Sequence, residues 1–111
     1  MGTLAAGDVV IVHFPFSDLA ASKLRPAVVL ADAGRDDWIL CQITSKPYGD
    51  KRAIRLEDGD FANGSLRLIS FARPGKLFTV HASLVAGKVG ELKAGKFAAI
   101  REAVMQVIGA Q

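Results

Sequence analysis

The sequence predicts an α+β fold that is mostly β: a compact barrel of about seven short strands with an amphipathic helix at its C-terminal end. Three observations lead to this fold class. Short apolar runs recur from residue 8 to residue 92 and are separated by turn-forming residues. From Lys93 to Ile108 the apolar residues recur instead at helical spacing. The length of 111 residues suits one domain, so residues 1–111 are expected to fold as a unit.

The first predicted strand covers residues 8–16, DVVIVHFPF, which are almost continuously apolar and therefore favour burial on both faces. Pro15 cannot donate to a ladder, so the strand is expected to end or to reach an edge there. A small polar loop is predicted over residues 17–25 and a second strand over residues 26–31. Because the residue before a proline favours extended geometry, Arg25 is expected at the junction of loop and strand.

Residues 38–45, WILCQITS, predict a third strand with two distinct faces. One face carries Ile39, Cys41 and Ile43, and the other carries Trp38, Leu40, Gln42 and Thr44. The second face turns polar toward the end of the strand. We therefore expect Gln42 and Thr44 to line one side of a common surface.

Turn formers and alternation predict the remaining elements. Turns are expected at residues 32–37, 46–50, 57–64 and 73–76, the last as a tight turn around Pro74 and Gly75. Strands are expected at residues 52–56, 66–71, 77–81 and 88–92. The apolar face of the C-terminal helix is expected to consist of Phe97, Ile100, Val104, Val107 and Ile108.

Charge and composition bound the classes of function. The net charge of +3 and the pI near 9.3 permit a nucleic-acid partner without requiring one. The single cysteine, Cys41, lies in an apolar run and predicts a buried thiol in a reducing compartment. The sequence has no signal peptide and no run of about 18 apolar residues, which predicts a cytoplasmic protein without a membrane partner. A chain this small and apolar is expected to bury surface in a homo-oligomer.

The sequence lacks the common metal and nucleotide motifs. It has no HExxH, CxxC or GxGxxG pattern. His13, His81 and Cys41 do not make a convincing set of ligands. We therefore expect neither a metal ion nor a cofactor.

The polar residues that remain are cationic and hydroxylic, among them Arg25, Thr44, Ser45 and Arg73. The planar fork of arginine suits phosphate oxygens, and a threonine hydroxyl can bond one of them. Such a set can cleave RNA without a metal, with the ribose 2′-OH as nucleophile and the protein stabilising the charge on phosphorus. The alternative, that Arg25 is a solvated surface residue, stays open at this point.

Four segments in this order and spacing carry a resemblance: GDVVIVHFPFSDL at 7–19, KLRPAVVL at 23–30, LCQITS at 40–45 and SFARPGKLFTVHASLVAGKVGEL at 70–92. With them the chain resembles the MazF/PemK family of toxins from type II toxin–antitoxin pairs, and it is closest to the PemK-like branch. The resemblance implies an SH3-like barrel of the CcdB/MazF type that dimerises around a shared RNA groove. It also implies a metal-independent, sequence-specific endoribonuclease that leaves 2′,3′-cyclic phosphate and 5′-hydroxyl ends.

The resemblance implies two catalytic residues, because Arg25 is the arginine of its RP motif and Thr44 is the threonine of its strand. Arginine stays protonated at physiological pH, so Arg25 is expected to clamp the phosphate and to stabilise charge. The residues expected to bind single-stranded RNA are Asp18, Lys23, Gln42, Ser45, Tyr48, Arg52 and Arg73. The implied partners are a cognate antitoxin, whose peptide fills the groove, and operator DNA held through that antitoxin.

The sequence departs from the family pattern at one place. Many members carry an acid a few residues before the RP pair, where this chain has Ser22, Lys23 and Leu24, and the nearest upstream acid is Asp18. His81 stays a candidate for removing the 2′-OH proton. Two non-catalytic alternatives also stay open: a binding module like the related gyrase-poisoning toxins, and a member that only binds antitoxin and operator DNA.

Overall fold

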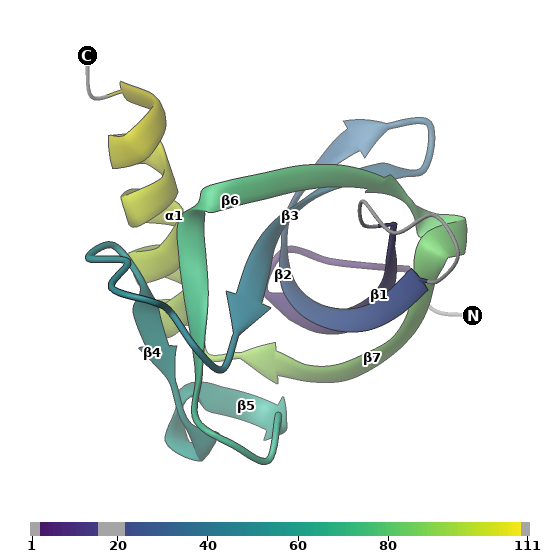
Figure 1. The fold of residues 1–111 in the computed structure, drawn as a ribbon. Helices are drawn as coiled ribbons and strands as arrows, with labels where there is room; N and C mark the ends of the chain where they lie inside the picture. The colour runs from purple at the N-terminus through teal and green to yellow at the C-terminus, as the bar shows by residue number, and fades with distance from the viewer. Residues whose placement is uncertain (1–2, 16–21, 110–111) are drawn as a thin grey trace.

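The computed structural model describes residues 3–15 and 22–109, which form a seven-stranded antiparallel sheet curled beside a C-terminal helix (Figure 1). The predicted fold class, a mostly β barrel with a C-terminal helix, is confirmed. The strands are β1 (Asp8–Pro15), β2 (Ser22–Gly34), β3 (Asp37–Thr44), β4 (Ile54–Leu56), β5 (Phe61–Gly64), β6 (Ser70–His81) and β7 (Val85–Leu92). The helix is α1 (Ala94–Gly109), and two short 3-10 turns are η1 (Asp58–Asp60) and η2 (Ala82–Leu84).

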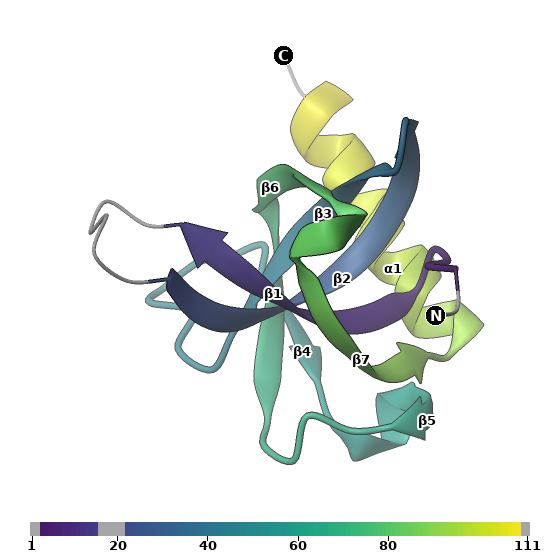
Figure 2. The same cartoon turned by 90° about the vertical axis from the view of Figure 1, so that its right-hand side faces the viewer.

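The strands lie in the order β4-β6-β3-β2-β1-β7-β5. β1 pairs with β2 on one side and with β7 on the other, and β6 pairs with both β3 and β4. The hairpin of β1 and β2 projects from the barrel on the side away from α1 (Figure 2). This projection separates the outer end of the hairpin, with Lys23, from the helix.

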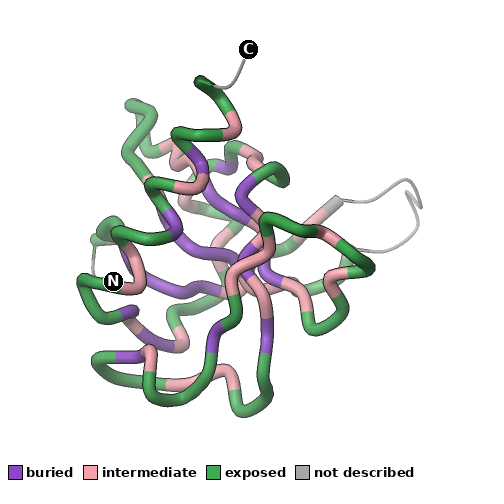
Figure 3. Tube along the Cα trace, turned by 90° about the vertical axis from the view of Figure 1, so that its left-hand side faces the viewer, coloured by how far each residue is buried: buried purple, intermediate pink, exposed green. Residues whose placement is uncertain are grey.

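Two apolar clusters lie on opposite faces of the sheet. The helix-side face contributes Val9, Val28, Cys41, Ile43, Leu56, Phe61, Ala72 and Leu92, packed with Ile100 and Val104 of α1. The opposite face, called the far face below, contributes Val10, Val12, Ala27, Val29, Leu40 and Val80. Figure 3 shows these buried stretches running through the middle of the molecule. Neighbouring residues of β1 belong to different clusters, which confirms that this strand is buried on both faces.

The loop predicted over residues 17–25 is wrong at its C-terminal end. β2 begins at Ser22, so Lys23 and Arg25 lie within a strand that pairs with β1. The strand also continues to Gly34, through part of the turn expected at residues 32–37. Pairing with β1 and β3 extends β2 in both directions, and local polarity does not reveal such pairing.

The segment from residue 57 to residue 81 also differs from the prediction. Residues 61–64, expected as a turn, form strand β5, and residues 66–69, expected as a strand, lie outside any strand. The tight turn expected at residues 73–76 is wrong, because these residues lie within β6. Cys41 of β3 pairs with Leu77 of β6, but Ile43, two residues later, pairs with Ala72. The residues of β6 between Ala72 and Leu77 therefore bulge out of the ladder and do not reverse the chain.

The predicted helix is confirmed, but its apolar face is narrower than expected. Ile100 and Val104 are buried against the sheet, and Phe97 packs at the edge of the same cluster. Ile108, expected on this face, is 64% exposed because it lies in the last turn, beyond the sheet. Within the described part of the chain, no helix is long and apolar enough to cross a membrane.

Candidate functional site

The two predicted catalytic residues flank the point at which β2 and β3 stop pairing. The β2–β3 ladder ends at the pair Ala27–Gln42. Two residues further along, Arg25 pairs with β1 and Thr44 pairs with β6, so the two strands continue with different partners. Alternation places Arg25 and Thr44 on the far face, together with Ala27 and Gln42. The sequence thus brings an arginine and a hydroxyl to one face at one end of the ladder.

An aromatic pair, not expected from the sequence, lies on the same face. The rings of Phe14 in β1 and Phe78 in β6 are stacked, with their centroids 4.6 Å apart and their planes 17° apart. Phe14 lies opposite Lys23 in the β1–β2 ladder, two residues beyond the position opposite Arg25. Alternation from the buried Val12 is the signal that could have placed Phe14 on this face. The pair adds apolar surface beside the candidate site.

The hydroxyl of Thr44 is held by the turn that follows β3. Its Oγ1 accepts a hydrogen bond from the Lys46 N–H at 3.1 Å and donates to the Lys46 carbonyl oxygen at 3.3 Å. The donated bond is long and therefore weak. The hydroxyl proton can thus turn toward a phosphate oxygen at small cost. Ser45, which follows directly, is exposed.

Consecutive turns fix the segment between β3 and β4. The Asp50 N–H donates to the Pro47 carbonyl oxygen at 3.0 Å, and the Arg52 N–H donates to Asp50 Oδ1 at 3.0 Å. Tyr48 and Gly49 both adopt left-handed backbone, with φ of 50° and 77°. Tyr48 is 82% exposed. Its ring is therefore displayed at the tip of a hydrogen-bonded turn.

Arg73 forms an ion pair with Asp50. Its Nε donates to Asp50 Oδ2 at 2.8 Å, and the two side chains are only 23% and 16% exposed. The hydrogen bond from Arg73, and then that from the Arg52 N–H, hold the pKa of Asp50 below its usual range. The Arg73 carbonyl oxygen accepts a hydrogen bond from the Cys41 thiol at 3.2 Å. Arg73 thus ties the segment after β3 to β6 and to the core.

The structure divides the predicted site residues into two groups. Tyr48, Arg52 and Arg73 line one shallow cleft of about 290 Å³, together with Lys76 and with Val107 of α1. Because α1 covers the helix-side face, this cleft lies on that side of the sheet. The predicted catalytic residues, Arg25 and Thr44, lie on the far face instead, and the turns after Thr44 connect the two groups.

Three further predicted residues have different surroundings. Gln42 is half-buried on β3, where it forms the last pair of the β2–β3 ladder with Ala27. Lys23 is exposed near the outer end of the β1–β2 hairpin. Asp18 lies outside the described residues.

His81 is not near Thr44, one of the two predicted catalytic residues. It lies opposite Asp37 at the start of β3, whereas Thr44 ends the same strand, about 20 Å further along it. Its Nδ1 accepts a hydrogen bond from the Ser83 N–H at 3.1 Å and caps the turn η2. This histidine therefore has a structural role, which argues against it as the base of the same protomer. The other histidine, His13, is exposed on β1.

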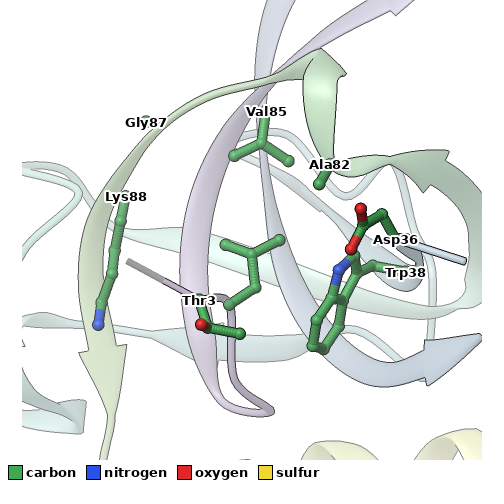
Figure 4. Close-up of a pocket in the computed structure, with 8 residues that line it drawn as sticks. Thr3, Asp36, Trp38, Ala82, Val85, Gly87 and Lys88 are labelled. Carbon is green, nitrogen blue, oxygen red and sulfur yellow. The ribbon is translucent and has the colours of Figure 1, made fainter. Parts of the chain in front are cut away.

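A largely apolar cleft lies apart from the predicted site. It has a volume of about 410 Å³, and Figure 4 shows Lys88 and Trp38 on opposite sides of it, with Val85 above and between them. None of the predicted site residues that the structure describes lines this cleft. Over residues 3–15 and 22–109, no cluster of three or more His, Cys, Asp or Glu side chains could hold a metal ion.

Comparison with protein families gives a match over nearly the whole chain. The family described as PemK-like, MazF-like toxin of type II toxin–antitoxin system matches residues 5–108. Among curated proteins, none matches the chain in sequence.

Several solved structures have the same fold. One is an endoribonuclease in complex with its cognate antitoxin from a mycobacterial species, with 12% identity, a TM-score of 0.76 and 98% of both chains covered. Another is MazE–MazF from Deinococcus radiodurans, with 17% identity, a TM-score of 0.74 and 100% of both chains covered. A MazF toxin of Mycobacterium tuberculosis has 16% identity and a TM-score of 0.71, covering 94% of this chain and 98% of that one. At these identities the likeness shows the fold.

Proposed function

Because the chain belongs to the family of PemK-like, MazF-like toxins of type II toxin–antitoxin systems, we propose that it is a sequence-specific endoribonuclease that cuts single-stranded RNA without a metal ion. The observation that carries the proposal is the position of Arg25 and Thr44 on one face of the sheet, on either side of the point where the β2–β3 ladder ends. A phosphate placed there can meet a guanidinium and a hydroxyl at once.

The proposed reaction is an in-line displacement at phosphorus. The ribose 2′-oxygen forms a bond to phosphorus and gives up its proton to water, while the bond from phosphorus to the 5′-oxygen breaks and that oxygen takes up a proton from water. Arg25 clamps the non-bridging oxygens and stabilises the charge that develops on them, because its fork can donate two hydrogen bonds at once. The Thr44 hydroxyl donates a hydrogen bond to one of these same oxygens. The products are a 2′,3′-cyclic phosphate and a 5′-hydroxyl, and DNA is spared because it lacks the nucleophile.

Residues around the pair would hold the flanking nucleotides. Gln42 lies beside the end of the ladder and can hydrogen-bond a base edge, while Lys23 and Ser45 are exposed on either side of it. Tyr48 offers an exposed ring on which an unpaired base can stack. Messenger RNA is the proposed substrate, which places the activity in the cytoplasm.

The proposed partners follow from the family and from its solved complexes. One structure with this fold is an endoribonuclease bound to its cognate antitoxin, so we expect an antitoxin peptide to cover the candidate site here as well. We also expect a homodimer, with operator DNA bound through the antitoxin. Exposed apolar side chains such as Leu24 and Met105 are available for these contacts.

The test is cleavage of a long single-stranded RNA by the purified protein in excess EDTA, with the new ends mapped by sequencing. Discrete cuts with 5′-hydroxyl ends, lost in Arg25→Ala and in Thr44→Ala, are expected. RNA that stays intact while expression arrests growth would instead favour a toxin that acts by binding a protein. Intact RNA without growth arrest would favour a member that only binds antitoxin and operator DNA.

A further inference from the structure

We infer that Asp50 is a positioning residue of the candidate ribonuclease site, and that Arg73 serves to hold Asp50 instead of binding an RNA phosphate. The inference rests on the proposed function, because it assigns to this pair the placement of Thr44 and Tyr48 for reaction with single-stranded RNA. It changes the role expected for Arg73 from a substrate contact to a support of the segment between β3 and β4.

Asp50 lies at the centre of the hydrogen bonds that shape this segment. Its Oδ2 accepts from Arg73 Nε at 2.8 Å and its Oδ1 accepts from the Arg52 N–H at 3.0 Å. Its backbone N–H donates to Pro47 at 3.0 Å, and its carbonyl oxygen accepts from the Ala53 N–H at 3.2 Å. One side chain and its own backbone thus fix both halves of the segment.

The same segment begins at the candidate catalytic hydroxyl. Thr44 Oγ1 is bonded to the backbone of Lys46, and the next residue, Pro47, accepts the bond from Asp50. A displaced Asp50 therefore displaces the turn that orients the Thr44 hydroxyl. Tyr48 depends on it in a second way, because its left-handed φ of 50° is unfavourable for a residue with a side chain and must be held by its surroundings.

The surroundings of Arg73 do not suit a phosphate ligand. Its charge is already matched by a carboxylate, and three quarters of its side chain is covered. A phosphate bound there would lie beside the Asp50 carboxylate, and the two negative charges would repel each other. Arg52 lines the same cleft and is exposed, so it is better placed to meet a negatively charged backbone.

Two variants break the contact from opposite sides. Arg73→Gln removes the guanidinium. Asp50→Asn removes the charge and leaves one oxygen for two donors, so one of the two hydrogen bonds must be lost. The double variant, which carries both substitutions, completes a double-mutant cycle. Lys76→Gln is the matched control, because it removes a positive charge from the same cleft without touching the ion pair.

The measurements are single-turnover cleavage of the full chain and binding of an RNA with a 2′-deoxy residue at the cleaved position, over a range of salt concentrations. We expect Arg73→Gln and Asp50→Asn each to lower the cleavage rate by about 10- to 100-fold. The double variant should be no worse than the poorer single variant, and Lys76→Gln should keep the wild-type cleavage rate at saturating RNA. The slope of log Kd against log salt concentration should stay unchanged in Arg73→Gln.

Opposite effects of the two single variants would overturn the inference. If Arg73 contacts a phosphate, Asp50→Asn frees it and RNA binds as well or better, while Arg73→Gln lowers the salt slope by about 0.7. Additive losses in the double variant would also overturn it, because independent roles add.

Hydrogen exchange separates this inference from the proposed function. Both single variants should speed amide exchange in residues 46–53 and leave β1 and β2 protected, whether or not the protein cuts RNA. If the wild type fails to cut RNA but the exchange result is obtained, the ribonuclease proposal fails and the structural role of Asp50 stands. Unchanged exchange in both variants would overturn that role.

Discussion

Arg25 and Thr44 each lie two residues beyond Ala27–Gln42, the last pair of the β2–β3 ladder, and on the same face of the sheet. At this point β2 continues along β1 and β3 continues along β6, so the sheet itself separates the two side chains while keeping them on one surface. A site built on strands in this way needs little reorganisation during reaction, because neighbouring strands hold each backbone.

Conservative changes at the two proposed catalytic residues should not be tolerated equally. Arg25→Lys keeps the charge but loses the planar fork, so we expect single-turnover cleavage to fall by about 100-fold. Thr44→Ser keeps the hydroxyl and should retain most activity, whereas Thr44→Val should lose about 100-fold. Thr44→Val also loses the bond from the Lys46 N–H, which costs about 1 kcal/mol of stability. Equal activity of the Ser and Val variants would contradict a role for the hydroxyl.

Stability at low pH should depend on Asp50. Its pKa in the folded protein is lowered from 3.8, chiefly by the hydrogen bond from Arg73. The stabilisation is therefore complete above the usual aspartate pKa and is lost as the pH falls through the lower folded value. At pH 6 we expect Asp50→Asn to lower the free energy of unfolding by about 2 kcal/mol. Urea unfolding should show this difference shrinking toward zero below pH 3.8.

The matched control for this pH dependence is Glu102→Gln, which neutralises an exposed carboxylate on α1. Its difference from wild type should stay within about 0.5 kcal/mol between pH 6 and pH 2.5. A difference between wild type and Asp50→Asn that stays constant down to pH 2.5 would contradict the ion-pair explanation.

The thiol of Cys41 should be inert in the folded protein. Burial raises the pKa of Cys41 from 9.0 to about 12, which lowers the thiolate fraction at pH 8 by about 1,000-fold. A disulfide reagent at pH 8 should therefore label the native protein at least about 1,000 times more slowly than the urea-unfolded chain. Fast labelling without urea would mean that β3 opens readily.

Local pattern predicted the elements that alternate or are continuously apolar, and it missed what depends on strand register. Gln42 and Thr44 were expected on one polar face of β3, and they lie there. That β2 turns away from β3 after Ala27 depends on where a ladder ends, and neighbouring residues do not encode this point. The position of Arg25 relative to Thr44 therefore could not be predicted from the sequence and had to be read from the folded structure.

The segment around Arg73 shows a different limit. The sequence ARPGK has the turn formers of a tight turn, but pairing with β3 and β4 keeps the chain extended there and absorbs the extra residues as a bulge. Asp50 lies 23 residues from Arg73, so no local rule relates them. Arg73, which the sequence predicts to bind RNA, is therefore found in an ion pair with Asp50.

The helix should contribute to stability through one turn and not through its end. Ile100 is fully buried against the sheet, whereas Ile108 is 64% exposed, so the same substitution tests both environments. Ile100→Ala should lower the free energy of unfolding by about 3 kcal/mol, because it removes buried apolar contacts and leaves a cavity. Ile108→Ala should change it by less than about 0.5 kcal/mol. Urea unfolding at several protein concentrations checks both values. An effect of Ile108→Ala that grows with protein concentration would show instead that a second protomer covers the end of α1, because only the associated form gains from that contact.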